Sequence, residues 1–243
     1  MGEEKPEEEL AGECLLESLT ERCRTTVLLY DRSRHIYAGS GLIASHFVHR
    51  SAVVIMRVIA GSAKGRVLAV PKGGPIRPTA QYVKEAIFSI LAAKVDKAVV
   101  LDLFAGSGSL GIEALSRGAA ECVLVDNDQR CVRTIKRNLE FTQLSDRARV
   151  YRMNVYKAVD ALNAEGRQFD IVFADPPYEG GHEQLLLARL SELRILRPSA
   201  TVVLEHSCRT ETPVRQGCLA RESLRTYGDT HVSLYVCMVE GQE

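Results

Sequence analysis

Apolar residues follow two alternating patterns along most of the chain. Continuous apolar runs, typical of buried strands, predict strands at 98–104, 121–126, 149–153, 169–174 and 201–204, with a closing pair at 224–227 and 232–238. Apolar residues at helical spacing predict helices at 79–94, from the end of a glycine-rich turn to about 117, at 132–139 and at 185–196. Strands separated by single helices imply right-handed crossovers, so we expect an α/β fold with a parallel, doubly wound sheet. No helical pattern separates the closing pair, so the final strand is expected to run antiparallel.

The first 78 residues differ from the rest in composition and in hydrophobic pattern. Residues 1–55 lack a clear period and begin with an acidic run, which is typical of a poorly structured extension. From Met56, two short apolar segments flank a turn rich in Gly, Lys and Arg, which predicts a small β-hairpin unit over 56–78. The main domain is then expected to cover 79–243. Because the pattern changes at Met56, we expect Met56 to be the functional start and residues 1–55 to be dispensable.

Composition excludes several classes of protein. The chain carries 31 Lys and Arg against 31 Asp and Glu, so its net charge argues neither for nor against a nucleic-acid partner. Its seven cysteines include no CxxC pair and its six histidines show no ligand spacing, which argues against a disulfide framework and against a metal site. The acidic N-terminus is the opposite of a signal peptide, and the most apolar early stretch is interrupted by His and Arg. We therefore expect a cytoplasmic protein with no membrane partner.

A glycine-rich turn follows the first strand of the alternating region and opens a helix. Gly106, Gly108 and Gly111 form a GxGxxG pattern, and Asp126 lies 20 residues after Gly106, at the end of the next strand. A carboxylate at this spacing accepts hydrogen bonds from the vicinal hydroxyls of a ribose. The glycines and Asp126 together predict a cofactor that contains a nucleoside. A plain strand–helix turn would explain one glycine but not this set.

Asp102, near the end of the first strand, helps to choose between nucleoside cofactors. NAD and S-adenosylmethionine both contain a ribose, so the glycine loop alone leaves both open. A dinucleotide loop presents backbone donors to a pyrophosphate, which a nearby carboxylate would repel. S-adenosylmethionine instead carries a cationic ammonium group that Asp102 could receive. Asp102 therefore favours S-adenosylmethionine.

An Asp-Pro-Pro-Tyr motif at 175–178 directly ends the strand at 169–174. Prolines cannot continue a strand ladder, so the carbonyl of Pro176 is expected to face the crevice at the strand ends. An exocyclic amine of a base is a poor nucleophile because its lone pair is delocalised into the ring. The Asp175 carboxylate and the Pro176 carbonyl could bind its two hydrogens and free that lone pair, while Tyr178 stacks on the base for about 1–3 kcal/mol. The alternative is a strand-ending turn with a surface tyrosine.

Basic residues gather in the predicted hairpin and the loop after it. Five cations occur there without an intervening acidic residue: Arg57, Lys64, Arg66, Lys72 and Arg77. Phosphate contact is the functional interpretation, and a solvated basic face is the alternative. With the motifs at the strand ends, we expect RNA contacts from Arg57, Lys64, Arg66 and Arg77.

From about residue 56 to residue 240 the chain resembles the bacterial 16S ribosomal RNA guanine-N2 methyltransferase family. The shared segments are Arg-Val-Ile-Ala-Gly from 57, Lys-Gly-Arg from 64, Arg-Pro-Thr from 77, Leu-Phe-Ala-Gly-Ser-Gly from 103, Asp-Pro-Pro-Tyr from 175 and Tyr-Gly-Asp-Thr from 227. The glycine loop is common to many methyltransferases, whereas its combination with the N-terminal segments is more diagnostic. Residues 79–85 depart from the family, because an Asp and an Arg that are common there are missing.

The resemblance implies a class I methyltransferase fold, which is a Rossmann-like doubly wound sheet of seven strands, the last antiparallel, with a small N-terminal β-hairpin unit. It implies that S-adenosylmethionine contacts Asp102, Phe104, Gly106, Ser107, Gly108, Asp126 and, near the adenine, Asn154. We expect Asn127, which follows Asp126, to belong to the same binding site. It also implies base handling by Asp175, Pro176 and Tyr178. The family's usual substrate is guanine 966 of 16S rRNA in the small ribosomal subunit or its assembly intermediate. We expect the same partner here and a monomeric enzyme.

Three other functions remain open. A DNA adenine-N6 methyltransferase shares the chemistry and the Asp-Pro-Pro-Tyr motif, although the absence of a sizeable target-recognition domain argues against it. A protein glutamine methyltransferase would ordinarily carry Asn where this chain has Asp175. A dinucleotide oxidoreductase or a noncatalytic RNA-binding module would leave the Asp-Pro-Pro-Tyr motif unexplained.

Overall fold

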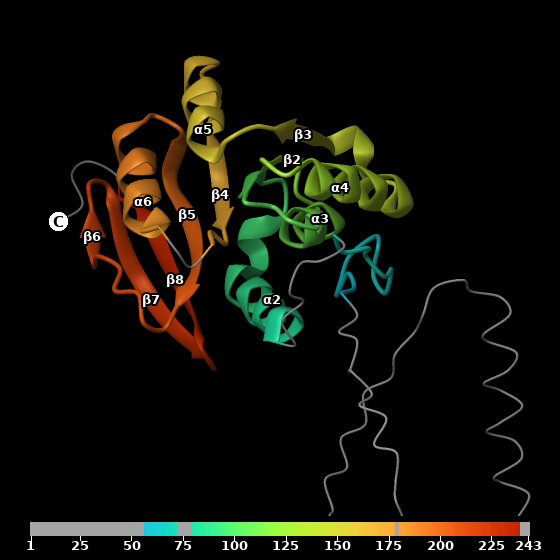
Figure 1. Cartoon of the computed structure of the whole chain (residues 1–243), viewed down its shortest axis with the longest axis horizontal. Coiled ribbons are helices and arrows are strands. Elements are labelled where there is room, and N and C mark those ends of the chain that lie inside the picture. Colours follow the sequence, from blue (N-terminus) through green and yellow to red (C-terminus); the bar gives the residue numbers. More distant parts are fainter. Residues whose placement is uncertain (1–55, 72–78, 178–179, 239–243) are drawn as a thin grey trace, which may run out of the picture. The chain divides into compact units, whose positions relative to one another are not determined.

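The computed structural model describes residues 56–71, 79–177 and 180–238. Within these residues one eight-stranded sheet has the strand order β3-β2-β1-β4-β5-β8-β7-β6. Strands β1 to β5 pair with one another in parallel, and β8 pairs antiparallel with both β5 and β7. Helices lie on both sides of this sheet (Figure 1). The expected doubly wound α/β fold and the antiparallel final strand are confirmed.

Strands β1 to β4 have five or six residues, β5, β7 and β8 have eight or more, and the edge strand β6 has two. Their bounds are β1 Val99–Leu103, β2 Glu121–Asp126, β3 Ala148–Arg152, β4 Phe169–Ala174, β5 Leu196–Ser207, β6 Arg215–Gln216, β7 Leu219–Tyr227 and β8 Thr230–Cys237. The helices are α2 Thr79–Leu91, α3 Ser109–Ser116, α4 Gln129–Thr142, α5 Val155–Ala164 and α6 His182–Glu192, with short 3-10 turns at Ala92–Val95 and Ser145–Arg147.

The sheet differs from the sequence prediction at its C-terminal edge. It has one strand more than the seven expected, because the two-residue strand β6 pairs with the start of β7 and is too short to show an apolar pattern. Helix α6 ends at Glu192, and Leu196 already belongs to β5, where it pairs with Phe169 of β4. Leu196 continues the apolar spacing of α6, so the sequence pattern does not show where the helix ends and β5 begins. Only the pairing of Leu196 with Phe169 shows that boundary. Helix α5 was not among the helices predicted from the hydrophobic pattern.

Two apolar cores lie on the two faces of the sheet. Helices α2, α3 and α4 pack on one face, against inward side chains such as Val100 and Leu124. Helices α5 and α6 pack on the other face, against Leu101 and Val125. Neighbouring residues of one strand thus enter opposite cores, which explains why the parallel strands are apolar throughout. None of the helices in the described residues is both long and apolar enough to span a membrane.

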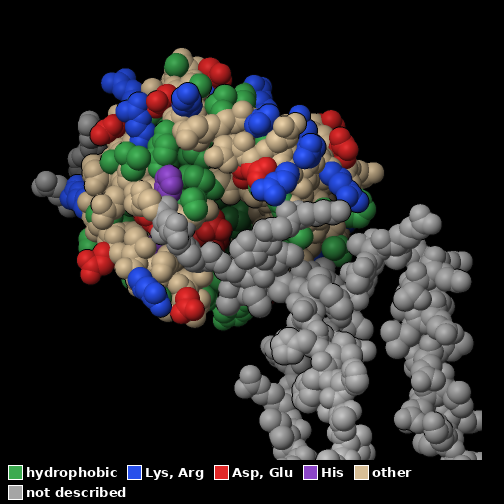
Figure 2. All heavy atoms as spheres, in the orientation of Figure 1, with side chains coloured by type: hydrophobic (Ala, Val, Ile, Leu, Met, Phe, Trp, Pro, Cys, Tyr) green, Lys and Arg blue, Asp and Glu red, His purple; other side chains and the backbone are tan. Residues whose placement is uncertain are grey.

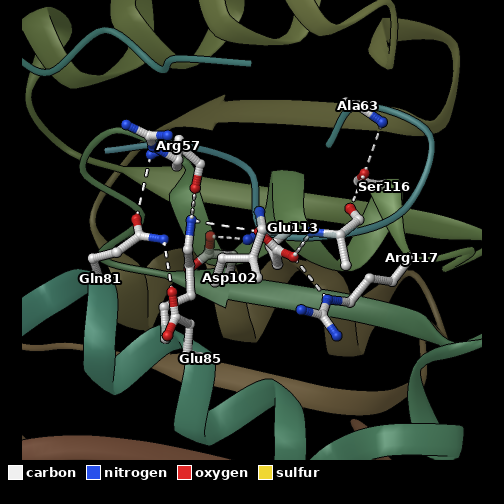
Figure 3. Close-up of polar contacts among 12 residues, drawn as sticks. Arg57, Ala63, Gln81, Glu85, Asp102, Glu113, Ser116 and Arg117 are labelled. Carbon is white, nitrogen blue, oxygen red and sulfur yellow. Dashed lines mark hydrogen bonds and ion pairs between the residues drawn. The ribbon is translucent and has the colours of Figure 1, made fainter. Parts of the chain in front are cut away.

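The segment 56–71 is fastened to α3 by buried polar side chains (Figure 3). An antiparallel bridge joins Arg57 and Val67 within this segment. The carboxylate of Glu113, which is fully buried, accepts hydrogen bonds from the backbone N–H groups of Ile59 at 2.7 Å and Ala60 at 3.0 Å. The hydroxyl of Ser116 accepts one from the N–H of Ala63 at 2.9 Å. These contacts seat the segment beside the helix that follows the glycine loop. The expected hairpin boundary at 78 and residues 1–55 lie outside the described residues.

Candidate active site

A cleft of about 620 Å³ opens at the carboxyl ends of the parallel strands, where ligands bind in open α/β sheets. Figure 2 shows a hollow in this face of the molecule with acidic side chains inside it. The lining includes most of the residues expected to bind cofactor and base, namely Asp102, Phe104, Gly106, Ser107, Asp126, Asn127, Asn154, Asp175 and Pro176. Residues far apart in the sequence thus share one cleft.

The glycine loop leaves β1 with an unusual backbone. Phe104, Gly106 and Gly108 have φ values of +57°, +56° and +76°, in the left-handed region that suits glycine but strains phenylalanine. Gly108, the residue before the first turn of α3, does not line the cleft, and a Cβ there would lie 3.1 Å from a methyl group of Leu124. A Cβ on Gly111 would lie 2.8 Å from the sulfur of Cys122. The last two glycines therefore let α3 approach the sheet closely, and Gly106 is the one that lines the cleft.

Asp126 ends β2 and is buried to 8% exposure at the cleft. One of its carboxylate oxygens accepts a hydrogen bond from the N–H of Gly106 and the other from the N–H of Asp128, each at 2.8 Å. These bonds fix the carboxylate against the glycine loop. Each oxygen keeps a second lone pair, so the group can still accept hydrogen bonds from a diol.

Asp102 lies deeper in the same cleft and is 3% exposed. Its Oδ2 accepts a hydrogen bond of 2.9 Å from the N–H of Gly111. Burial raises the pKa of this carboxyl to about 8; the bond from Gly111 opposes the rise, and the nearby carboxylates of Asp126 and Asp175 add to it. A cationic group beside Asp102 would favour its ionised form.

The two asparagines expected at the cofactor lie on separate parts of the cleft wall. Asn127 follows Asp126 directly and is exposed. Asn154 caps α5, because its side-chain oxygen accepts hydrogen bonds from the N–H groups of Tyr156 at 3.0 Å and Lys157 at 3.4 Å. The amide nitrogen of Asn154 is not used by the cap, so it can donate to a ligand.

The Asp-Pro-Pro segment follows β4 and reaches the cleft from the neighbouring strand end. Asp175 is exposed there, while Pro176 is buried. Tyr178, the expected stacking residue, lies outside the described residues. The sheet order β2-β1-β4 places the ends of these strands side by side. Asp126, Asp102 and Asp175 therefore come from three adjacent strands.

An aromatic pair in the cleft was not predicted from the sequence. The hydroxyl of Tyr156 and Nδ1 of His182 lie 2.7 Å apart, and their rings stack with centroids at 6.0 Å. The ring of Phe104 meets His182 edge-on at 5.8 Å. All three residues line the cleft. The available signals were the position of Tyr156 two residues after Asn154 and that of His182 shortly after the Asp-Pro-Pro-Tyr motif.

The predicted RNA-binding residues lie outside the cleft lining. Arg57 and Lys64 are exposed on the segment 56–71, and Arg66 is partly exposed, while Arg77 lies outside the described residues. Lys84 of α2 was missed by sequence reasoning. It lines the cleft, its Nζ donates to the carbonyl of Arg57 at 2.7 Å, and burial lowers its pKa. In the described part of the chain, no group of three or more His, Cys, Asp or Glu could hold a metal ion.

Two curated relatives are similar over most of the chain. "Putative rRNA methyltransferase YlbH" of Bacillus subtilis is 42% identical over 180 residues, which are 74% of this chain and 98% of the relative. "Ribosomal RNA small subunit methyltransferase D" of Escherichia coli is 33% identical over 187 residues, which are 77% of this chain and 92% of the relative.

Solved structures share the fold. "Putative methyltransferase yhhF" from Escherichia coli has a TM-score of 0.66 at 30% identity and covers 76% of this chain and 99% of its own. An RNA methyltransferase from Salinibacter ruber in complex with S-adenosyl-L-homocysteine has a TM-score of 0.53 at 20% identity, over 69% of this chain and 97% of its own, a likeness of fold alone. The fold is that of class I methyltransferases. The family described as conserved hypothetical protein 95 matches residues 56–236, and the chain belongs to this family.

Proposed function

We propose that the chain transfers a methyl group from S-adenosylmethionine to the exocyclic N2 of a guanine in 16S rRNA. One observation carries the proposal: Asp102, Asp126 and the Asp175-Pro176 pair meet in one cleft at the ends of three adjacent strands. The first two suit a nucleoside with a cationic tail, and the third suits a planar amine. A nucleoside cofactor alone would leave the Asp-Pro-Pro segment without a role.

The donor and acceptor set of the cleft fits S-adenosylmethionine. Asp126, held by two backbone N–H groups, would accept the ribose hydroxyls. Asp102 would receive the ammonium group, since a buried carboxyl gains most from a cation beside it. Gly106 lets the loop backbone approach the ligand without a side chain in the way. Phe104, Ser107, Asn127 and Asn154 would complete this binding site, while Gly108 supports it from beneath. When bound, the cofactor supplies an electrophilic methyl group.

The residues of the chain would then prepare the amine. The Asp175 carboxylate and the Pro176 carbonyl would accept its two hydrogens, which favours a pyramidal nitrogen with a free lone pair. After the transfer the nitrogen must lose a proton, and Asp175 can pass that proton to solvent because it is exposed. The contribution of the protein is mainly positioning and preorganised dipoles. Tyr178, outside the described residues, would stack on the base.

The substrate class is supported by the relatives and by the site. YlbH and the Escherichia coli protein are both named as rRNA methyltransferases, the latter of the small subunit. The restriction to guanine N2 follows from the family resemblance in the sequence. The proposed partner is 16S rRNA in the small subunit or its assembly intermediate. The enzyme is proposed to act as a monomer in the cytoplasm. Arg57, Lys64, Arg66 and Arg77 would contact its phosphates.

The functional unit is proposed to begin at Met56, with the RNA-binding segment at 56–78 and the methyltransferase domain at 79–243. The family match begins at the same residue. A chain that starts at Met56 is expected to transfer methyl groups as fast as the full chain. A markedly slower truncated protein would show that residues 1–55 take part.

The test is transfer of a labelled methyl group to unmodified 16S rRNA and to small subunits, followed by nucleoside analysis of the product. N2-methylguanosine is expected, and N6-methyladenosine or an unlabelled RNA would contradict the proposal. Asp175→Ala should abolish transfer while calorimetry still detects cofactor binding. Tyr178→Phe should retain activity that Tyr178→Ala loses, since only the former keeps a ring.

A further inference from the structure

Helix α4 presents a row of cations to solvent. Its apolar and small polar residues face the sheet, and Val132, Ile135 and Leu139 are buried there. On its other side four basic residues are exposed: Arg130, Arg133, Lys136 and Arg137. We refer to these four as the α4 basic face. Their spacing of three, three and one residues places them on one side of the helix. Figure 2 shows Lys and Arg side chains gathered over the part of the molecule that carries α4.

Within the part of the chain that the structure describes, three of these four cations form no ion pair. Arg130 pairs with Asp128 at 2.7 Å, beside the cleft that both residues line. Among the described residues, no carboxylate forms an ion pair with Arg133, Lys136 or Arg137. Three exposed positive charges in a row therefore remain available to an anionic partner. Such a row attracts a polyanion through many weak contacts.

Helix α4 connects the cleft with the segment 56–71. At the C-terminal end of the helix, the guanidinium of Arg66 donates to the carbonyl of Phe141 and lies 5.7 Å from its ring centroid. About one turn before Phe141, on the buried side of the helix, the side chain of Asn138 bonds the backbone of Ala69 at 2.8 and 2.9 Å and the carbonyl of Ser107 at 2.9 Å. From Arg130 to Phe141 the helix rises about 16 Å, at 1.5 Å per residue. This length spans several consecutive phosphates of a nucleic-acid strand.

We propose that the α4 basic face binds the phosphate backbone of the RNA substrate and leads it from Arg66 to the cleft. The inference rests on the proposed function, which makes the substrate an RNA. Phosphate contacts of this kind set register and orientation but do not read sequence. The face would therefore govern the affinity for RNA and its dependence on salt, not the chemistry at Asp175.

The test compares two triple variants that remove equal charge. Arg133→Ala, Lys136→Ala and Arg137→Ala are combined in one protein; none of these residues lines the cleft. The control combines Lys97→Ala, Arg194→Ala and Arg215→Ala, which are exposed residues without ion pairs among the described residues. Lys97 and Arg194 lie just before β1 and β5, at the end of the sheet opposite the cleft. Binding of a 16S rRNA transcript is followed by anisotropy from 50 to 200 mM KCl.

The α4 variant is expected to bind about tenfold more weakly at 100 mM KCl, with a log–log salt slope shallower by about 2, since each single-strand phosphate contact contributes about 0.7. Its affinity for S-adenosylmethionine and its unfolding temperature should match the wild type. A slope equal to that of the control variant would overturn the inference. Methyl transfer by the wild type to the same RNA is measured in parallel, so that failure of the proposed function, with no transfer, is distinguished from failure of this surface.

Discussion

Oδ2 of Asp102 accepts a 2.9 Å hydrogen bond from the backbone N–H of Gly111, the third glycine of the loop. The strand that carries the carboxyl and the helix that follows the loop are thereby joined at the floor of the cleft. A Cβ on Gly111 would lie 3.0 Å from the same oxygen, so the glycine also leaves room for the contact. The position of α3 and the ionisation of Asp102 are therefore linked through this hydrogen bond.

Cofactor binding is expected to depend on pH through Asp102. In the free protein its pKa is about 8, so below pH 8 the carboxyl is mostly protonated and must release a proton to pair with an ammonium group. The affinity for S-adenosylmethionine should rise with pH by up to about tenfold per unit well below pH 8. Above pH 8 it should fall, because the ammonium group of the ligand loses its own proton there. Titration calorimetry in buffers of different ionisation enthalpy measures both the affinity and the released proton. Asp102→Asn should remove the rise below pH 8, and a flat wild-type profile from pH 6 to 8 would contradict the assignment.

The same pKa has a consequence for stability, with the opposite sign to that of a typical carboxylate. The pKa of Asp102 is raised from 3.8 to about 8, so the folded protein holds more protons than the unfolded chain between these values. The contribution of Asp102 to the free energy of unfolding therefore falls as pH rises through this window. Urea unfolding of the wild type and of Asp102→Asn at pH 5 and pH 8 should show a stability difference that shifts in favour of Asn at the higher pH.

Two glycines in the segment 56–71 allow a matched test of its contact with α3. Gly61 and Gly65 both have φ of +82°, so Ala at either position costs about 1–2 kcal/mol of backbone strain. A Cβ on Gly61 would lie 1.8 Å from the carbonyl oxygen of Ser116, whereas one on Gly65 has nothing within 4 Å. Gly61→Ala should therefore lose clearly more unfolding free energy than Gly65→Ala. Equal losses of unfolding free energy, measured by urea unfolding, would show that the close contact of Gly61 with Ser116 of α3 does not contribute to stability.

Glu113 is expected to be among the most sensitive buried positions. Its carboxylate bonds two backbone N–H groups and lies 3.5 Å from Nζ of Lys84, and both side chains are almost fully buried. Glu113→Ala would leave Lys84 as an unpaired buried charge and should cost about 3–5 kcal/mol in the free energy of unfolding. Glu113→Gln keeps one acceptor oxygen and should cost less. Glu140→Ala, at an exposed site on α4, is the control and should change stability by less than about 0.5 kcal/mol.

Tyr156→Phe isolates the hydrogen bond between Tyr156 and His182. The ring remains, while the 2.7 Å contact with Nδ1 is lost, at a cost of about 1 kcal/mol in stability. Because both residues line the cleft and neither belongs to the Asp-Pro-Pro-Tyr motif, we expect KM for S-adenosylmethionine or RNA to rise several-fold with kcat retained. Steady-state kinetics with each substrate varied in turn decides the point. Unchanged KM values for both substrates would show that the hydrogen bond between Tyr156 and His182 is structural only.

The local pattern of the sequence was sufficient for the strands of the parallel sheet and for the acidic residues that end them. Strand β2 and strand β4 have the predicted bounds, because a buried parallel strand is apolar at every position. Because parallel strands present their carboxyl ends at one edge of the sheet, the pattern also places Asp102, Asp126 and Asp175 at that edge. The strand order, in which β4 pairs with β1 and not with β3, came from the structure. Strand β6 and the start of β5 could not be found in this way, since their register depends on partners elsewhere in the sheet.

The sequence by itself therefore determined the fold class and the identity of the acidic groups at the strand ends. Only the tertiary structure decided what surrounds them. The bond between Ile59 and Glu113 joins residues 54 positions apart, and that between Ala69 and Asn138 joins residues 69 apart. Such contacts depend on how helices pack on the sheet, and a periodic pattern records only that a side chain is buried, not which partner it meets. The stacked Tyr156 and His182, and the exposed cations of α4 between cleft and Arg66, become visible for the same reason.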